Sequence, residues 1–409
     1  MSSRLTSPEP SPLPLPFGIK SRQINLSHRG HLSYHILEAG SPSLPLLVLL
    51  HGFPEISYSW RKTILPLANA GYHVIAPDQR GFGRTTGWDT RSYKDVDLHT
   101  FSATVLVQDI LVLVAALGYT QVNCVVGHDA GAVVAANCAL MRPDIFQAVV
   151  LMTHPFAGIP ELPFGAANGA EETRRVEEMP AATAAMVHDQ LASLGRKHYE
   201  WYYSTARANA DMVGPVTPGG LRGFFRGYFH VKSGSWNSNY NTLHPPRRWS
   251  AEELAEMPEY YIMPLQKTMP ETIHEMMLRE LAEAKESSKQ WLSNDELEVY
   301  VSEYARTSFQ GGLNWYRVWT GDCGSRTSLM QDLYVFSGLK IKVPCCFIGG
   351  QKDWGMYQVP GALERMCGSK EVCEDFRFCK IIDGAGHWIA QEKPNKAVEG
   401  ILEFLRGVN

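Results

Sequence analysis

The chain has 409 residues, of which 44% are hydrophobic and 20% are charged, so it can bury a large core. Its formal net charge of −4 gives no electrostatic reason to expect binding to nucleic acid or to an anionic membrane. The sequence contains no run of about 18 or more uncharged apolar residues, so no membrane span is predicted.

The N-terminal residues 1–16 are rich in Ser and Pro and lack the apolar core of a signal peptide. They are interpreted as a flexible tail. The eight cysteines include no CxxC pair, and their spacing favours no metal site. Reduced thiols are typical of intracellular proteins, so we expect a cytoplasmic location.

Buried strands alternate with helices in the first part of the chain. Short apolar runs that end in turns predict strands covered on both faces, and the rhythm of strand and helix indicates a parallel α/β sheet. The expected strands are Leu46–Leu50, His73–Pro77, Val122–Val126 and Ala148–Met152, and the expected helices are Thr100–Leu117 and the small-residue segment that ends at Met141.

This rhythm stops at Pro155, and strand patterns return only at Val343–Gly350 and Phe376–Ile382. We therefore expect one α/β core in two parts, residues 17–154 and 341–409, that is split by a large, mainly helical cap insertion at 155–340. In the second half of the chain the expected helices are Ala251–Glu256, Pro270–Gln290, Asn294–Thr307, Gly361–Met366 and Lys396–Phe404, and the expected loops are Ala166–Ala170 and Ser233–Asn241.

A tight turn between a buried strand and a small-residue helix has the sequence Gly127-His128-Asp129-Ala130-Gly131. This is the glycine-x-nucleophile-x-glycine form of a nucleophile elbow, with a carboxylate where serine is usual. Small neighbours are needed because the elbow backbone is strained and the helix packs close to the strand. Asp129 is therefore the predicted nucleophile, with the Ala130 N–H directed into the same space.

Three further residues follow predicted strands. Phe53 lies just after the first central strand, where its N–H could join that of Ala130 in an oxyanion hole. Asp353 follows the penultimate strand and His387 follows the last. Nucleophile, acid and histidine thus occur in the order of α/β-hydrolases, at the sheet edge where open α/β sheets bind ligands.

These motifs together resemble the epoxide hydrolase branch of the α/β-hydrolase superfamily, over Gly18 to Phe404. The resemblance implies an α/β-hydrolase fold. One departure is Ala130, where many relatives carry Trp or another large residue. The matching pieces are His51-Gly52-Phe53-Pro54-Glu55, Asp78-Gln79-Arg80-Gly81-Phe82-Gly83, Gly127-His128-Asp129-Ala130-Gly131 and Gly384-Ala385-Gly386-His387-Trp388.

The implied chemistry opens an epoxide to a vicinal diol without a metal or another cofactor. Asp129 attacks an epoxide carbon and forms an alkyl-enzyme ester. His387, oriented by Asp353, then activates the water that hydrolyses this ester. The expected partner is a small, apolar epoxide substrate, and a homodimer is an oligomeric state that the sequence leaves open.

Cap tyrosines would donate a proton or a hydrogen bond to the epoxide oxygen. Tyr260-Tyr261-Ile262 resembles the first tyrosine motif of the family, with Tyr261 as the donor. The segment Gly311–Arg317 resembles the second, with Tyr316 as the donor. Trp315, Trp388 and Tyr260 are the expected substrate-binding residues.

Two alternatives stay open. One is an Asp-dependent hydrolase of another electrophile, such as a haloalkane or haloacid; however, Ala130 and Val133 occupy positions where dehalogenases place halide-binding groups. The other is a non-hydrolytic biosynthetic cyclase or binding protein of this fold. His51 and His128 are interpreted as supporting residues, and Asp78 and Arg80 as a buried pair that supports a loop.

Overall fold

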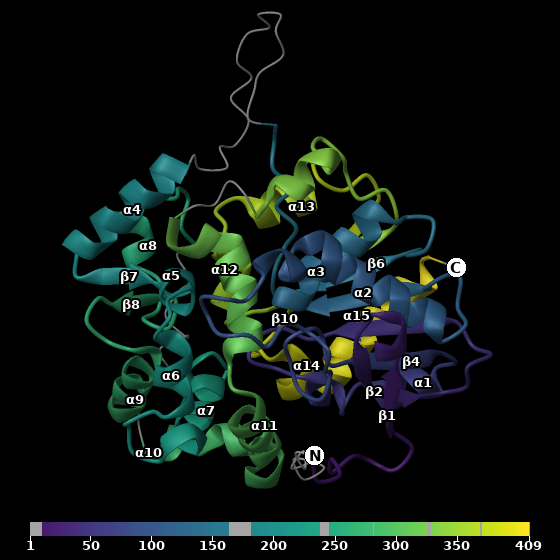
Figure 1. Cartoon of the computed structure of the whole chain (residues 1–409), viewed down its shortest axis with the longest axis horizontal. Coiled ribbons are helices and arrows are strands. Elements are labelled where there is room, and N and C mark those ends of the chain that lie inside the picture. Colours follow the sequence, from purple (N-terminus) through teal and green to yellow (C-terminus); the bar gives the residue numbers. More distant parts are fainter. Residues whose placement is uncertain are drawn as a thin grey trace, which may run out of the picture.

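The computed structural model describes residues 10–162, 181–237, 245–280, 282–324, 329–368 and 370–408. Figure 1 shows two lobes side by side, a larger one built around a sheet and a smaller one built of helices. Helix α12 (Gln310–Gly324) runs along the boundary between them.

The larger lobe contains an eight-stranded sheet in the order β1-β2-β4-β3-β5-β6-β9-β10. Strands β1 and β2 are antiparallel to their neighbours. The other six strands of this sheet, in the order β4-β3-β5-β6-β9-β10, pair with one another in parallel. The mostly parallel α/β sheet expected from the sequence is therefore confirmed. The strands are β1 (Lys20–Asn25), β2 (Ser33–Ala39), β3 (Leu46–Leu50), β4 (His73–Pro77), β5 (Cys124–His128), β6 (Val149–Met152), β9 (Cys345–Gly350) and β10 (Phe376–Ile382).

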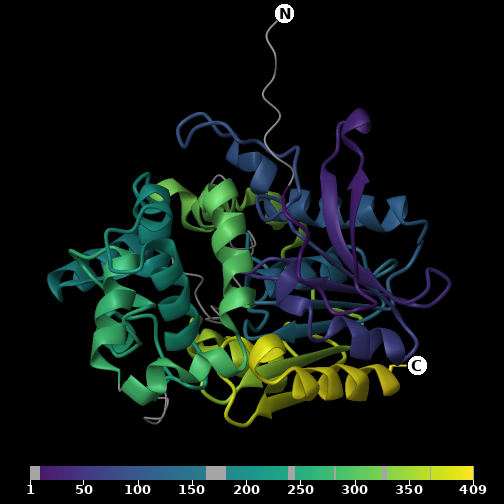
Figure 2. The ribbon, with the colours of Figure 1, turned by 90° about the horizontal axis from the view of Figure 1, so that it is seen from below.

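Helices cover both faces of this sheet, which explains why its central strands are apolar throughout. Successive residues of β3 point to opposite faces, so that Val48 joins one hydrophobic cluster and Leu49 the other. Figure 2 shows the C-terminal helix α15 along one side of the larger lobe. On the Val48 side lie α2 (Ala103–Ala116), α3 (Ala130–Met141) and α13 (Ala362–Gly368), and on the Leu49 side α1 (Ile64–Asn69), α14 (Ile389–Glu392) and α15 (Pro394–Arg406).

The smaller lobe is formed by the segment between β6 and β9. It includes a short antiparallel pair of strands, β7 with β8, which the sequence did not predict. The boundaries 17–154, 155–340 and 341–409 remain our proposal for the domain division. The elements of this segment are α4 (Ala181–Ser193), β7 (Arg196–His198), α5 (Tyr199–Tyr203), α6 (Ala208–Val213), α7 (Gly220–Val231), α8 (Ala251–Ala255), β8 (Ile262–Pro264), α9 (Met269–Arg279), α10 (Ala282–Lys285), α11 (Asn294–Thr307) and α12.

Helix α11 has the bounds expected from the sequence, because a capping box begins it: the Ser293 hydroxyl accepts from the Glu296 N–H and the Glu296 carboxylate accepts from the Ser293 N–H. The single helix expected over 270–290 is wrong. Helix α9 ends at Arg279, and Glu280 turns inward, where its carboxylate accepts from Asn237 Nδ2 at 2.9 Å. A tertiary contact thus ends a segment whose local pattern favours one helix.

The predicted tail is described only from Pro10 onward, and this part is held against the core. Arg84 Nη2 donates to the Ser11 carbonyl at 2.6 Å, and the Tyr58 hydroxyl donates to the Pro14 carbonyl at 3.2 Å. The interpretation of residues 1–16 as a flexible tail is therefore corrected for residues 10–16. The loop expected at 166–170 lies outside the described residues.

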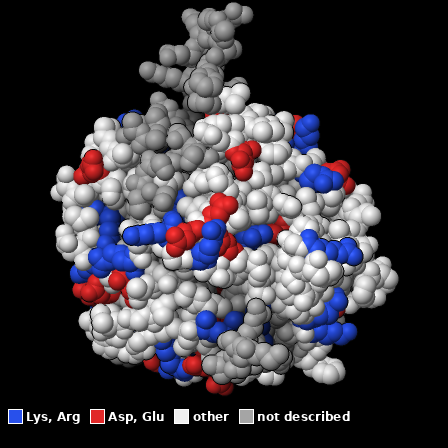
Figure 3. All heavy atoms as spheres, viewed as in Figure 1, with Lys and Arg blue, Asp and Glu red and all other residues white. Residues whose placement is uncertain are grey.

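Acidic and basic side chains are interspersed on the face of the molecule that Figure 3 shows. No single-sign patch dominates that face, which agrees with the small net charge of −4. Within the described ranges, no helix has both the length and the apolar character that a bilayer crossing requires.

Close packing of α3 against the end of β3 depends on Gly131. A Cβ atom at this position would meet the carbonyl oxygens of Leu50 at 2.3 Å and His51 at 2.5 Å. We predict that Gly131→Ala destabilises the fold by about 1–3 kcal/mol, because backbone has to move to accept one methyl group. Denaturant unfolding measures this loss. The matched control is Gly368→Ala, since a Cβ there meets nothing within 4 Å; equal stability of both variants would contradict the prediction.

Candidate active site

The predicted nucleophile lies at a strained turn between β5 and α3. Asp129 has φ 53° and ψ −122°, which is left-handed backbone that an L residue rarely adopts. Its N–H is held by two acceptors, the Met152 carbonyl at 3.1 Å and the Thr153 hydroxyl at 3.2 Å. The turn therefore has the backbone of a nucleophile elbow and presents a carboxylate at its apex.

His387 lies between the two predicted aspartates. Its Nδ1 is 3.0 Å from Asp353 Oδ1, and its Nε2 is 3.4 Å from Asp129 Oδ2. Asp353 Oδ1 also accepts from the Gly355 N–H at 2.7 Å, which fixes the carboxylate. Three residues that are far apart in the sequence thus form one Asp–His–Asp row.

The exposure of this row shows which end faces open space. The Asp129 side chain retains 11% of its accessible surface, whereas those of His387 and Asp353 retain 1% each. His387 Nε2 has no hydrogen-bond partner among the described residues, and its distance to Asp129 is longer than an ordinary hydrogen bond. This nitrogen can accept a proton from a water molecule beside Asp129.

One of the two N–H groups of the predicted oxyanion hole contacts the same carboxylate. The Phe53 N–H donates to Asp129 Oδ1 at 2.9 Å. Ala130 is the first residue of α3, so its N–H belongs to the helix terminus, where intrahelical acceptors are lacking. Stabilisation of an oxyanion by the two N–H groups together stays a prediction.

Asp129 is held in its charged form. Burial by itself would raise the pKa of this carboxyl, but the interaction with His387 at 3.4 Å, and the positive charges of Lys232 and His128, bring the pKa well below its usual range. An ionised carboxylate with a free oxygen edge is what nucleophilic attack requires.

The two predicted proton donors approach from the smaller lobe. Tyr316 lies on α12, with its ring 5.3 Å from that of Phe53, and Tyr261 immediately precedes β8. Burial raises the pKa of both phenols well above 10, and the negative charge of Asp129 raises both further, as does that of Asp353 for Tyr261. Both phenols therefore stay protonated near Asp129, and the Tyr261 hydroxyl has no partner among the described residues.

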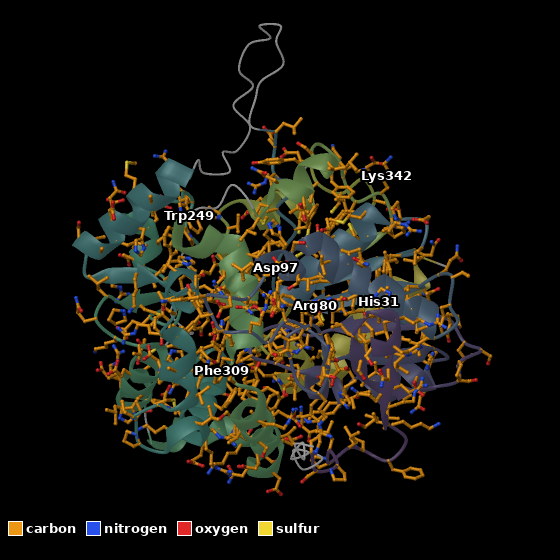
Figure 4. All side chains as sticks on the ribbon, viewed as in Figure 1. His31, Arg80, Asp97, Trp249, Phe309 and Lys342 are labelled. Atoms are coloured by element: carbon orange, nitrogen blue, oxygen red, sulfur yellow. The ribbon has the colours of Figure 1, made fainter. Side chains whose placement is uncertain are left out.

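The three predicted substrate-binding residues have different surroundings. The Trp388 ring lies 4.6 Å from that of His387, and the Tyr260 ring lies 4.8 Å from that of Tyr261. Trp315 packs between α12 and the core, where its indole N–H donates to the carbonyl of Arg80, a residue labelled in Figure 4. Trp388 and Tyr260 thus contact residues of the candidate site, whereas the Trp315 ring packs against Phe82 and Trp319.

The two histidines near the site have the supporting surroundings expected of them. His51 Nε2 accepts from the Gln79 N–H at 3.1 Å and His51 Nδ1 faces the Gly52 carbonyl at 2.9 Å, so the ring is neutral with its proton on Nδ1. His128 Nδ1 faces Glu55 Oε2 at 2.7 Å and His128 Nε2 faces the His387 carbonyl at 2.7 Å. Two acceptors indicate a doubly protonated ring.

The pairing of Asp78 with Arg80 that we expected is wrong. Asp78 instead accepts from the Ser57 N–H at 2.8 Å and faces His35 Nδ1 at 2.7 Å. Arg80 forms a two-pronged ion pair with Asp109, with both distances 2.7 Å. Each side chain does support a loop, but through a partner that is distant in the sequence.

Sequence reasoning missed three charged residues around the site. Glu55 lies at the end of the motif that begins at His51, and its carboxylate holds His128. Glu392 accepts from the Trp388 N–H at 2.9 Å and from the Gly386 N–H at 3.1 Å, and so fixes the loop that carries His387. Lys232 lies 4.6 Å from the centre of the Tyr261 ring. Their positions are set by long-range contacts, which leave no local pattern.

Within the part of the chain that the structure describes, no cluster of three or more His, Cys, Asp or Glu side chains has an arrangement that could hold a metal ion. The groups assembled around Asp129 are the predicted nucleophile, the predicted base with its acid, a backbone N–H donor and two phenols. These groups can perform attack at carbon followed by ester hydrolysis.

Comparison with known proteins agrees with this fold. The model of the α/β hydrolase fold family matches residues 45–394. The chain therefore belongs to the α/β-hydrolase fold family.

Similar proteins narrow this assignment. Epoxide hydrolase A of Mycobacterium tuberculosis is 30% identical over 386 residues, which cover 91% of this chain and 94% of that protein. Epoxide hydrolase B of the same organism is 32% identical over 369 residues, covering 89% and 92%. The structure of an epoxide hydrolase from an endophytic Streptomyces superposes with a TM-score of 0.70 at 28% identity, over 96% of this chain and 97% of that one. Within its family, the chain belongs to the epoxide hydrolase branch.

The buried pair of His128 and Glu55 predicts a pH-dependent contribution to stability. Burial would lower the pKa of His128, but the charge and hydrogen bond of Glu55 outweigh it and raise the pKa from 6.5 to about 9. A raised pKa stabilises the fold fully below pH 6.5, and the gain is lost as the pH rises through about 9. The free energy of unfolding should fall across this window by up to about 3 kcal/mol more in the wild type than in His128→Gln. Parallel pH profiles in urea unfolding would refute a charged His128.

Proposed function

We propose that this protein adds water to an epoxide and yields a vicinal diol, through an alkyl ester on Asp129. The observation that carries the proposal is the row of Asp129, His387 and Asp353, with His387 Nε2 at 3.4 Å from the Asp129 carboxylate. Similarity to proteins named epoxide hydrolase over most of the chain supports the substrate class.

In the first step, Asp129 Oδ2 attacks an epoxide carbon from the side opposite the ring oxygen. The carbon–oxygen bond breaks, and its electron pair moves to the oxygen, which takes a proton from Tyr261 or Tyr316. Both phenols are buried, and the charge of Asp129 raises the pKa of each, which supports this role. A phenol that stays protonated can donate where a carboxylate could not.

In the second step, His387 removes a proton from water, and the hydroxide attacks the carbonyl carbon of the Asp129 ester. Asp353 stabilises the imidazolium that forms on His387. The Phe53 N–H, already 2.9 Å from Asp129 Oδ1, would stabilise the oxyanion together with the Ala130 N–H. On collapse the ester C–O bond breaks, and the departing alkoxide takes the proton of the hydroxyl that was added to the Asp129 carboxyl, which releases the diol and restores the carboxylate. The proton gained by His387 returns to the phenolate.

Aromatic side chains surround the proposed reaction centre, which favours an apolar substrate. The ring of Tyr316 lies 5.0 Å from that of Tyr203 and 5.8 Å from that of Tyr199, and Tyr199 lies 5.2 Å from Tyr261. These rings give apolar area with a few hydroxyl groups that can fix the orientation of a substrate.

The ester intermediate gives the most direct test of this function. His387→Gln should still be alkylated by an epoxide but should hydrolyse the ester at least about 100-fold more slowly, because the general base is absent. Intact-protein mass spectrometry should then find an adduct whose mass equals that of the epoxide, and peptide mapping should place it on Asp129. The double variant His387→Gln/Asp129→Asn is the control and should stay unmodified. An unmodified His387→Gln, with an epoxide that the wild type consumes, would rule out the ester.

Variants of the two tyrosines test whether these phenols assist the departure of the epoxide oxygen. Changing both Tyr261 and Tyr316 to Phe should slow epoxide opening by about 10²–10⁴-fold, since acid assistance is lost while Asp129 and His387 remain. Rapid-quench measurement of ester formation reports this step alone. Tyr304→Phe is a matched control, because it removes another buried phenol of the smaller lobe. Ester formation at the wild-type rate in the double variant would exclude the two phenols as donors.

A further inference from the structure

Lys232 lies in the smaller lobe, one residue past α7, yet its backbone is part of the candidate site. Its carbonyl accepts from the His387 N–H at 2.9 Å. Contact there is so close that a Cβ on Gly386 would lie 2.6 Å from the Lys232 oxygen. The residue that positions the His387 backbone therefore also brings a lysine side chain to the site.

The ammonium group of Lys232 is surrounded by aromatic rings. Its Nζ lies 4.6 Å from the centre of the Tyr261 ring, 5.1 Å from Tyr228, 5.7 Å from Trp388 and 5.8 Å from Tyr260. It also donates to the Tyr228 hydroxyl at 3.4 Å. The side chain is only 3% exposed, and cation–π contacts of this kind offset part of the cost of burying a charge.

The charge of Lys232 reaches the predicted nucleophile, where it helps to lower the pKa of Asp129. When Asp129 becomes an ester, its negative charge disappears from the carboxylate. The charge appears on the epoxide oxygen and, after proton transfer, on the phenol that donated the proton. A fixed cation beside that phenol stabilises the product of this step more than a neutral side chain would.

We propose that Lys232 is a positioning residue that acts through Tyr261: its ammonium stabilises the phenolate that Tyr261 becomes when the epoxide ring opens. This inference rests on the proposed function and deepens it by distinguishing the two phenols. The ammonium lies against the Tyr261 ring, whereas the Tyr316 ring packs on Phe53, Tyr203 and Trp319. Tyr261 is therefore the phenol that gives up its proton, and Tyr316 is the one that donates a hydrogen bond.

A second buried lysine nearby has a different role and serves as a control. Lys352 is 8% exposed and its Nζ donates to the Gly234 carbonyl at 2.9 Å, which ties the segment after Lys232 to the larger lobe. If Lys232 only held the two lobes together, as Lys352 does, its loss would lower stability and would leave the alkylation rate unchanged.

The test is a double-mutant cycle in the His387→Gln background, where the alkylation step is isolated. Styrene oxide is the probe, and the rate of adduct growth on Asp129 is followed by mass spectrometry. Lys232→Met should slow alkylation about 10- to 100-fold while Tyr261 is present, and by less than about 3-fold in Tyr261→Phe, because the cation acts through that phenol. Lys232→Arg should recover most of the rate, and Lys352→Met should leave it unchanged.

A transient near-ultraviolet absorbance of tyrosinate gives an independent readout in single-turnover mixing. It should accompany alkylation in the parent and be lost in Lys232→Met. Equal slowing by Lys232→Met with and without Tyr261 would overturn the inference and leave the proposed function intact. Absence of any adduct in the His387→Gln parent would overturn both.

Discussion

The backbone of Asp129 turns through a left-handed conformation, and the rest of the site depends on that turn. Such a conformation costs about 1–3 kcal/mol at a residue with a side chain, so the surroundings have to hold it. They do so with acceptors for the Asp129 N–H on both Met152 and Thr153. The turn also requires glycine at 127, because a Cβ there would lie 2.2 Å from the Gly131 carbonyl oxygen. The result is a carboxylate raised above the sheet edge, where the Phe53 N–H reaches it.

The loop that carries His387, the predicted base, is held from the opposite direction by contacts from both lobes. Glu392 accepts N–H groups from Gly386 and Trp388 in the His387 loop and, at 2.8 Å, from Gly234 in the smaller lobe. One carboxylate thus joins the loop that carries the predicted base to the segment that carries Lys232. Movement of the smaller lobe would therefore shift His387 as well as the phenols. The helical insertion is therefore connected to the candidate site through its backbone as well as through its phenols.

Much of the fold and of the site follows from local sequence signals. Apolar runs locate the central strands because those strands are covered on both faces, and the small residues around Asp129 mark the elbow because only small residues fit there. The strands β7 and β8 were not predicted because three residues are too few to show the alternation of apolar and polar side chains that is typical of a strand. The prediction of a single helix over 270–290 is wrong because the helix ends before Glu280, where a contact with Asn237 overrides helix propensity. The sequence could not indicate a role for Lys232 for the same reason, because the rings around its ammonium group come from segments that are distant in the sequence.

The origin of the product's oxygen tests the central claim, the ester on Asp129, most directly. A single turnover would be run with enzyme in excess over an epoxide, in water labelled with oxygen-18, and both the diol and the peptide that contains Asp129 would be weighed by mass spectrometry. If the ester forms, the added oxygen of the diol comes from the carboxylate, so the first diol is unlabelled and the label enters Asp129. A first-turnover diol that carries the label, with Asp129 unlabelled, would mean that water attacks the epoxide directly, and it would contradict the account.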